Sequence, residues 1–180
     1  MTLLALVFAI TWFSSTAMAT HLPLLLREAG ATPAVAIGAA ALVGPAQVAG
    51  RILEFGLLQR FHPLLSARLA IIAHPIGALS IIAFGAPAAI IFAILHGAGN
   101  GILTIAKGTL PLAIFGPTGY GFRQGLLMAP ARFAQACAPF LFALLIERYG
   151  AMALLLSIII GFAGLAALLF LTSPSMVEHA

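Results

Sequence analysis

Long apolar runs separated by short polar or glycine- and proline-containing breaks dominate the pattern along this chain. A helix that crosses a bilayer needs roughly 20 mostly apolar residues, and six runs reach about that length. They cover residues 3–25, 34–55, 66–84, 87–106, 124–146 and 151–172. The pattern predicts an all-α, polytopic membrane protein with six transmembrane helices and no separate soluble domain.

Composition supports a lipid environment. Hydrophobic residues make up 63% of the 180 residues and charged residues 7%, whereas an ordinary soluble domain is about 25% charged. So few charges cannot build a soluble surface, and we expect the lipid bilayer to be the main partner. The basic residues are scattered singly rather than clustered with aromatic residues, so no nucleic-acid partner is expected.

The available side-chain chemistry argues against an enzyme. The chain has no Asp, which excludes aspartyl-protease and aspartate-dependent phosphatidyl transfer chemistry. No Ser follows a Gly-x pair, as a rhomboid-like nucleophile would, and no two His residues have His-x-x-His or His-x-x-x-His spacing. Metal ligands must converge on one point, so we expect no metal site and no cofactor. An intramembrane enzyme or a channel remains the alternative to a transporter.

The loop cations predict an orientation, because cytoplasmic loops carry an excess of Lys and Arg. One side would hold both termini and five cations, whereas Arg27 and Arg148 lie on the other side. The five are Arg51, Arg60, Arg68, Lys107 and Arg123. Both termini are therefore expected in the cytoplasm. The sequence Ala17-Met18-Ala19 looks like a signal-peptidase site, but the missing basic start favours a first span over a cleaved signal.

Three alternating glycines lie in the fourth run and a lysine follows it directly, in the stretch HGAGNGILTIAKG at 96–108. A nucleotide-binding loop needs a preceding strand and a βαβ unit, which an apolar run of this length does not provide. Gly97 and Gly101 lie four residues apart on one helix face, where a second helix can approach closely. Gly121 and Gly125 share this spacing. We therefore expect helix packing rather than phosphate binding at this stretch.

A polar stripe follows the same run. His96, Asn100, Thr104 and Lys107 are spaced by four, four and three residues, which places them on one helix face. Polar groups facing lipid would lack hydrogen-bond partners, so the stripe is expected to face protein or water. It either forms interhelical hydrogen bonds or lines a path for a solute.

Arg132 lies inside the fifth run, nine residues after Arg123, or about 13 Å along a helix. An Arg at that depth costs about 3 kcal/mol and indicates a functional site by default. Gln135 is one turn away, and Pro130 and Pro139 flank the pair. Arg132 either attracts an anionic substrate group or a coupling carboxylate, or it extends its side chain toward the cytoplasmic headgroups or bonds freed backbone carbonyls.

Several stretches resemble the major facilitator superfamily of transporters. In VGPAQVAGRILE at 43–54, Gly50-x-x-x-Glu54 is similar to the start of its loop signature G-x-x-x-[DE]-R-x-G-[RK]-[RK]. Phe55 replaces the Arg of this signature, and Arg60 is what is left of the closing basic pair. The stretches GNGILTIAKGTLPLAIFGPTGYGFRQG and APARFAQACAPFLFALLIERYG look like the tenth and eleventh helices of bacterial members.

The resemblance implies the C-terminal half of a twelve-helix carrier, built as two three-helix inverted repeats at about 1–84 and 87–172. It implies secondary-active transport of a small solute, with proton coupling as an option, in a bacterial cytoplasmic (inner) membrane. Residues at the cavity would be Thr11, Ser14, Ser15, His96, Asn100, Arg132 and Gln135, and those of a gating loop Gly50, Arg51, Glu54 and Arg60. The chain would be a fragment, or pair with an N-terminal half made separately or with a second copy.

Overall fold

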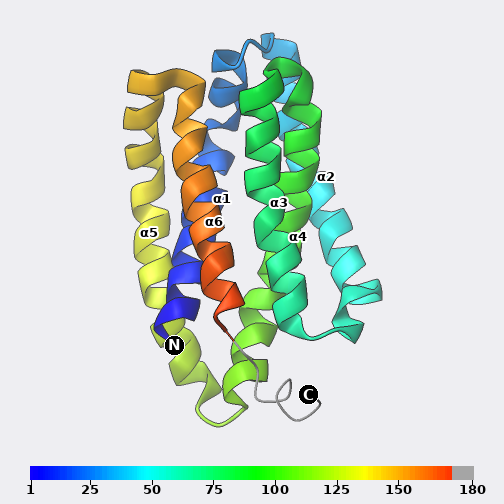
Figure 1. Cartoon of the computed structure of the whole chain (residues 1–180), viewed down its shortest axis with the longest axis vertical. Helices are drawn as coiled ribbons and strands as arrows, with labels where there is room; N and C mark the ends of the chain where they lie inside the picture. The colour runs from blue at the N-terminus through cyan, green and yellow to red at the C-terminus, as the bar shows by residue number, and fades with distance from the viewer. Residues whose placement is uncertain (172–180) are drawn as a thin grey trace.

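The structure, a computed structural model, describes residues 1–171 as six α-helices and three short 3₁₀ helices, with no strand in this part (Figure 1). The α-helices are α1 (Thr2–Glu28), α2 (Pro33–Gly56), α3 (Pro63–Phe84), α4 (Ala89–Phe115), α5 (Tyr120–Tyr149) and α6 (Leu154–Leu169). The 3₁₀ helices are η1 (Leu58–Arg60), η2 (Ala86–Ala88) and η3 (Gly150–Ala153). Successive α-helices alternate in direction, so the start of α1 and the α4–α5 turn lie at the same end.

Five helical segments are long and apolar enough to cross a membrane. They are Thr2–Glu28, Pro33–Arg60, Pro63–Phe84, Ala86–Phe115 and Tyr120–Leu169. The last of these contains α5, η3 and α6, and the chain reverses direction within it at Gly150, whose φ is 56°. By itself α6 has 16 residues, fewer than the span predicted for 151–172. Residue 172, the last of that predicted span, lies outside the described part of the chain, and so does Glu178. The chain is all-helical and compatible with an integral membrane protein.

The connection predicted between the fourth and fifth spans, residues 107–123, is wrong. Helix α4 continues to Phe115 and α5 begins at Tyr120, so the turn contains only four residues. Gly116 and Gly119 make this turn possible, because their φ angles of 72° and 65° are rarely adopted by other residues. Helix α4 continues past Lys107, and the buried Lys107 side chain packs against Trp12 instead of extending into water.

The helices pair in a regular way. The main contacts are α2 with α4, α1 with α5, α3 with α4, and α3 with α6. Helices α2 and α4 run in the same direction, as do α1 and α5 (Figure 1). Helices α1, α2, α4 and α5 surround the polar cleft described below, and α3 packs behind α4 and against α6.

Glycines bring α2 and α4 into backbone contact. A Cβ atom at Gly97 would lie 2.7 Å from Val43 O, and one at Gly101 would collide with the backbone of Gln47. On the α2 side, a Cβ atom at Gly50 would collide with the backbone of Ala98. The two helices can therefore be this close only while these positions have no side chain.

Two arginines that the sequence places near cytoplasmic loops bond helix ends instead. Arg68 of α3 donates to Leu168 O at 2.9 Å and to Leu171 O at 3.0 Å, at the end of α6. Arg123 of α5 donates to Phe115 O at 2.6 Å, at the end of α4. The last carbonyls of a helix lack intrahelical donors and carry partial negative charge, so both arginines stabilise these ends.

A polar layer separates the two larger of three apolar cores in the described residues. One core holds the later part of α1 and the beginning of α4, including Leu22 and Phe92. The other holds the beginning of α1 and the later part of α4, including Phe8 and Leu110. Between them, buried polar side chains come from α1, α3 and α4, among them Ser14, His74 and His96. The candidate functional site begins at this layer.

Candidate functional site

A cleft of about 550 Å³ lies between α1, α2, α4 and α5. Its polar lining residues are Trp12, Ser15, Gln47, Arg51, Asn100, Thr104, Lys107, Gln124 and Arg132, together with Gly108 and Met128. Three of these side chains are cationic and none of the lining residues is acidic. A volume of this size fits a small-molecule ligand, and the surplus of positive charge favours an anion.

Trp12 is in contact with two of the cations. Lys107 Nζ is 4.0 Å from the centre of the Trp12 ring, and Arg132 Cζ is 4.4 Å from it. Both are cation–π distances, and they bring α4 and α5 side chains to one α1 residue. Arg132 also donates to Gln135 Oε1 at 2.9 Å, which fixes the direction of its guanidinium. Lys107 is buried, whereas Arg132 is exposed.

Hydrogen bonds hold α5 against α4 at the edge of the cleft. Gln124 Nε2 donates to Lys107 O at 3.0 Å, and Tyr120 OH donates to Gly108 O at 3.0 Å. The Gln124 Oε1 atom is buried and has no protein partner in the described part of the chain. An acceptor left unpaired at the lining of a cleft is available to a donor group of a ligand or to water.

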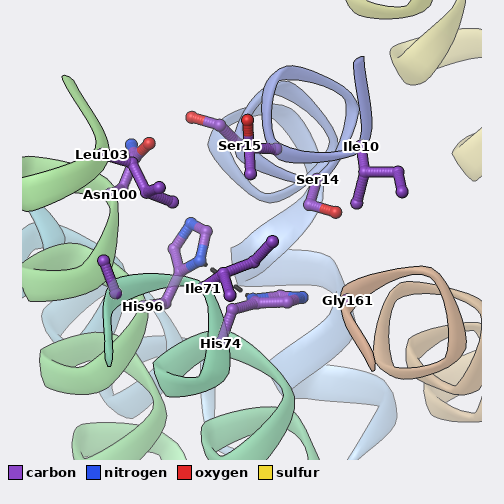
Figure 2. A pocket seen from close by; sticks show the side chains of 11 residues that line it. Ile10, Ser14, Ser15, Ile71, His74, His96, Asn100, Leu103 and Gly161 are labelled. Atoms are coloured by element: carbon purple, nitrogen blue, oxygen red, sulfur yellow. Dashed lines mark hydrogen bonds between the residues drawn. The ribbon is translucent and has the colours of Figure 1, made fainter. Parts of the chain in front are cut away.

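The cleft shares walls with two further cavities that reach into the polar layer. A cavity of about 270 Å³ is bordered by Ser15, Gln47, His96 and Asn100. A smaller one of about 30 Å³ is bordered by Ser14, Ser15, His96 and Asn100. Ser15 and Asn100 border all three spaces. Figure 2 shows them at the smallest of the three, near the two histidines.

Two histidines meet at the smallest cavity. His74 Nδ1 of α3 and His96 Nδ1 of α4 lie 2.9 Å apart, and both rings are buried (Figure 2). Phe92 stacks on the His96 ring at a centroid distance of 5.5 Å and meets the His74 ring edge-on at 5.7 Å. The aromatic ring restricts both imidazoles to this arrangement.

The structure places the predicted polar stripe on these cavities. Asn100, Thr104 and Lys107 line the cleft, and His96 lies deeper, at the two smaller cavities. Among the candidates on α1, Ser15 borders all three cavities, while Ser14 and Thr11 border only the smallest.

The remaining candidates have different positions from those expected. Gln135 is not a lining residue and acts on Arg132. Gly50, Arg51 and Glu54 belong to helix α2 and not to a loop, because α2 continues to Gly56; Arg60 ends η1. Glu54 is buried, and its Oε2 atom has no protein partner in the described residues.

Some lining residues were not singled out from the sequence. Trp12, Gln47 and Gln124 line the cleft, and His74 borders the smallest cavity. Each is a polar side chain in an apolar run, which is the available signal, because such residues usually face protein or a cavity in membrane helices. Within residues 1–171, no three metal-ligating side chains converge on one point.

Two comparisons with known proteins find no match for this chain. No protein-family model matches the chain, and a search of the curated proteins finds no significant match. The functional argument therefore depends on the geometry of the cleft and on the sequence.

Proposed function

We propose that the chain is a six-helix half of a secondary-active carrier of the major facilitator type, with a small anion as its substrate. The observation that carries this proposal is the cleft, in which Arg51, Lys107 and Arg132 line one space without any acidic lining residue. A cation inside a bilayer has a free-energy cost, which reaches about 3 kcal/mol at the centre of the bilayer. An anion that enters the cleft offsets part of that cost, which gives the site a preference for negative charge.

The pairing of the helices supports two inverted three-helix repeats. In two such repeats, α1 corresponds to α4, α2 to α5 and α3 to α6, so each contact should have a counterpart between the corresponding helices. The α2–α4 contact has its counterpart in the α5–α1 contact. The counterpart of the α3–α4 contact is the α6–α1 contact, and the α3–α6 contact is its own counterpart. All of these contacts are present. Transporters built from inverted repeats bind substrate near the bilayer midplane, at the level of discontinuous or polar segments. On this proposal, α6 is the sixth span.

A second bundle is part of the proposal. Arg51, Thr104 and Arg132 are exposed on the open side of the cleft, and lipid would leave them without partners. An N-terminal half or a second copy of this chain would cover them and complete the path. We place both termini in the cytoplasm and the protein in a bacterial inner membrane, as the loop cations and the family resemblance favour.

The direct test is transport by the chain in lipid vesicles, alone and together with a candidate second half. The expected result is accumulation of a labelled small anion, such as benzoate, sulfate or phosphate, above its external concentration when a proton gradient is imposed. The Arg132→Gln substitution should lower the rate, and the matched substitution Arg148→Gln, at the opposite end of α5, should not. Flux that only follows the anion gradient would support a channel instead, and full activity in Arg132→Gln would contradict a substrate role for Arg132.

The fluorescence of Trp12 tests the charge of the cleft without transport. It is the single Trp of the chain, and both Lys107 and Arg132 lie against its ring. Iodide, an anionic quencher, should quench its emission more strongly than neutral acrylamide does. The Arg132→Gln substitution should reduce the iodide effect and leave the acrylamide effect unchanged. An equal loss of quenching by iodide and by acrylamide would indicate that the exposure of Trp12 has changed. That result would contradict attraction of anions by the cleft.

A further inference from the structure

We infer that His74 and His96 form a single proton-binding site that couples proton movement to the cleft. The coupling rests on the proposed function, whereas the shared proton can be tested without any transport. The starting observation is the 2.9 Å contact between the two Nδ1 atoms. That distance is a hydrogen bond, so one of the two nitrogens carries the proton and the other accepts it.

The protonation states of the pair follow from this bond. A neutral imidazole carries one N–H group, on Nδ1 or on Nε2. The ring that donates from Nδ1 has its lone pair on Nε2, and the ring that accepts at Nδ1 carries its proton on Nε2. One further proton can bind, at Nε2 of the donating ring, without breaking the bond. A second would place N–H groups on both Nδ1 atoms and separate the rings, so the joined pair binds one added proton.

The surroundings provide a place for that proton to arrive. The cavity of about 30 Å³ is bordered by both histidines and by Ser14. It is large enough for one or two water molecules. The Ser14 Oγ and His74 Nε2 atoms are buried and have no protein partner in residues 1–171. A water molecule in this cavity could bond both atoms and deliver a proton to the pair.

Within residues 1–171, no Lys, Arg or Glu side chain lines either of the two cavities that the pair borders. Helix α1 contributes Ser14 and Ser15 to the adjoining cavities, α2 contributes Gln47 and α6 contributes Gly161, so the lining residues of both cavities are uncharged apart from the histidines. Arg51, Lys107 and Arg132 line the cleft beyond Ser15 and Asn100. A bound anion there would compensate the added positive charge of the pair, and an empty cationic cleft would oppose it. Anion and proton should therefore bind together.

Nitrogen-15 NMR of the whole chain, labelled at histidine and held in bilayers, tests the shared proton. The expected signature is a scalar coupling between the two Nδ1 nuclei, together with one common titration midpoint for both rings. Substituting His74→Gln or His96→Gln should abolish the coupling and move the midpoint of the remaining ring by about one pH unit or more. The wild-type coupling needs no variant, so misfolding of a variant does not affect this test.

His21 offers a matched control, because its Nε2 bonds Pro139 O at 2.8 Å and it lies outside both cavities that the pair borders. His21→Gln should leave the coupling and the common midpoint unchanged. Independent titration of His74 and His96 in the wild type, or absence of the coupling, would overturn the shared site.

Adding benzoate tests the link to the cleft. The pair should then take up its proton at a higher pH, by about one unit, and the Arg132→Gln substitution should remove most of this shift. A shared proton whose midpoint does not respond to benzoate, in a protein whose Trp12 still attracts iodide, would overturn the coupling and leave the anion-binding proposal intact. Loss of both responses would contradict the anion site itself.

Discussion

Helices α4 and α5 have similar sequences in outline but very different surroundings. They have 27 and 30 residues, each has a Gly-x-x-x-Gly pair and internal proline, and both line the cleft. Helix α4 is packed between α2 and α3, whereas α5 packs mainly on α1. A Cβ atom at Gly97 or Gly101 of α4 would meet α2 within 3 Å, but one at Gly121 or Gly125 of α5 would meet nothing within 4 Å.

The difference teaches that a Gly-x-x-x-Gly pair marks a place where a second helix could pack closely, but does not show that a helix packs there. Close packing also needs a second helix whose own surface is small or flat at that level. Helix α2 provides this surface with Gly50 and Ala46. In residues 1–171 no other helix lies within 4 Å of a Cβ atom at Gly121 or Gly125, so this part of α5 remains open. The comparison can be tested position by position.

The largest expected effect separates the two glycine pairs. Gly101→Leu should lower the free energy of unfolding by about 3 kcal/mol, because its side chain would collide with the backbone of Gln47 and push α2 away. Gly125→Leu should change it by less than about 0.5 kcal/mol, because its surroundings are open. Reversible unfolding in mixed micelles measures both. Equal effects would show that the spacing, and not the packing, determines the outcome.

The second effect distinguishes the two cations at Trp12. Lys107→Met should raise the free energy of unfolding by about 1 kcal/mol, because it removes a buried charge that no acidic residue of the cleft compensates. Arg132→Met should leave stability within about 0.5 kcal/mol, since Arg132 is exposed. Both should lower iodide quenching of Trp12 roughly twofold. A destabilised Lys107→Met protein would mean that the cation–π contact outweighs the burial of charge.

The smallest effect concerns one of the hydrogen bonds that join α4 and α5. Tyr120→Phe removes the donor to Gly108 O and should cost about 0.6 kcal/mol, the usual value for such a bond in a membrane protein. The matched control is Tyr149→Phe, because Tyr149 is exposed at the other end of α5. The same unfolding experiment applies, and no difference between the two variants would mean that the bond contributes nothing to stability.

The sequence predicts the helices well and their ends less well. Length and hydropathy were sufficient to place helices over most of each predicted apolar run, because the backbone must bond within itself in an apolar environment. The α4–α5 connection failed, since Lys107 was taken as the end of a span. The side chain of a cationic residue in a helix can extend into water or pack against an aromatic ring. Which of the two occurs depends on a residue from another helix, here Trp12, and the sequence around Lys107 does not contain that information.

In the candidate site, too, the sequence predicts what depends on one helix and misses what depends on contacts between helices. Helical spacing puts Asn100 and Thr104 on one face, and the cleft lies on that face. The histidine pair was not predicted, because His74 and His96 are 22 residues apart and belong to different helices. Only the contact of α3 with α4 brings them together, and nothing in the spacing of either residue encodes the distance between the helix axes.

The long α4–α5 hairpin also determines how deeply the protein would sit in a bilayer. Its two helices extend past the others at one end (Figure 1), and α5 alone, at 30 residues, is about 45 Å long, well beyond a hydrocarbon layer of about 30 Å. Its glycine turn must therefore project into the headgroups or the water. Lys107, nine residues before Gly116, then lies about 13 Å below that turn. Lys107, and with it the cleft that it lines, would be immersed only a few ångströms below the lipid headgroups, where a dissolved anion can first meet it.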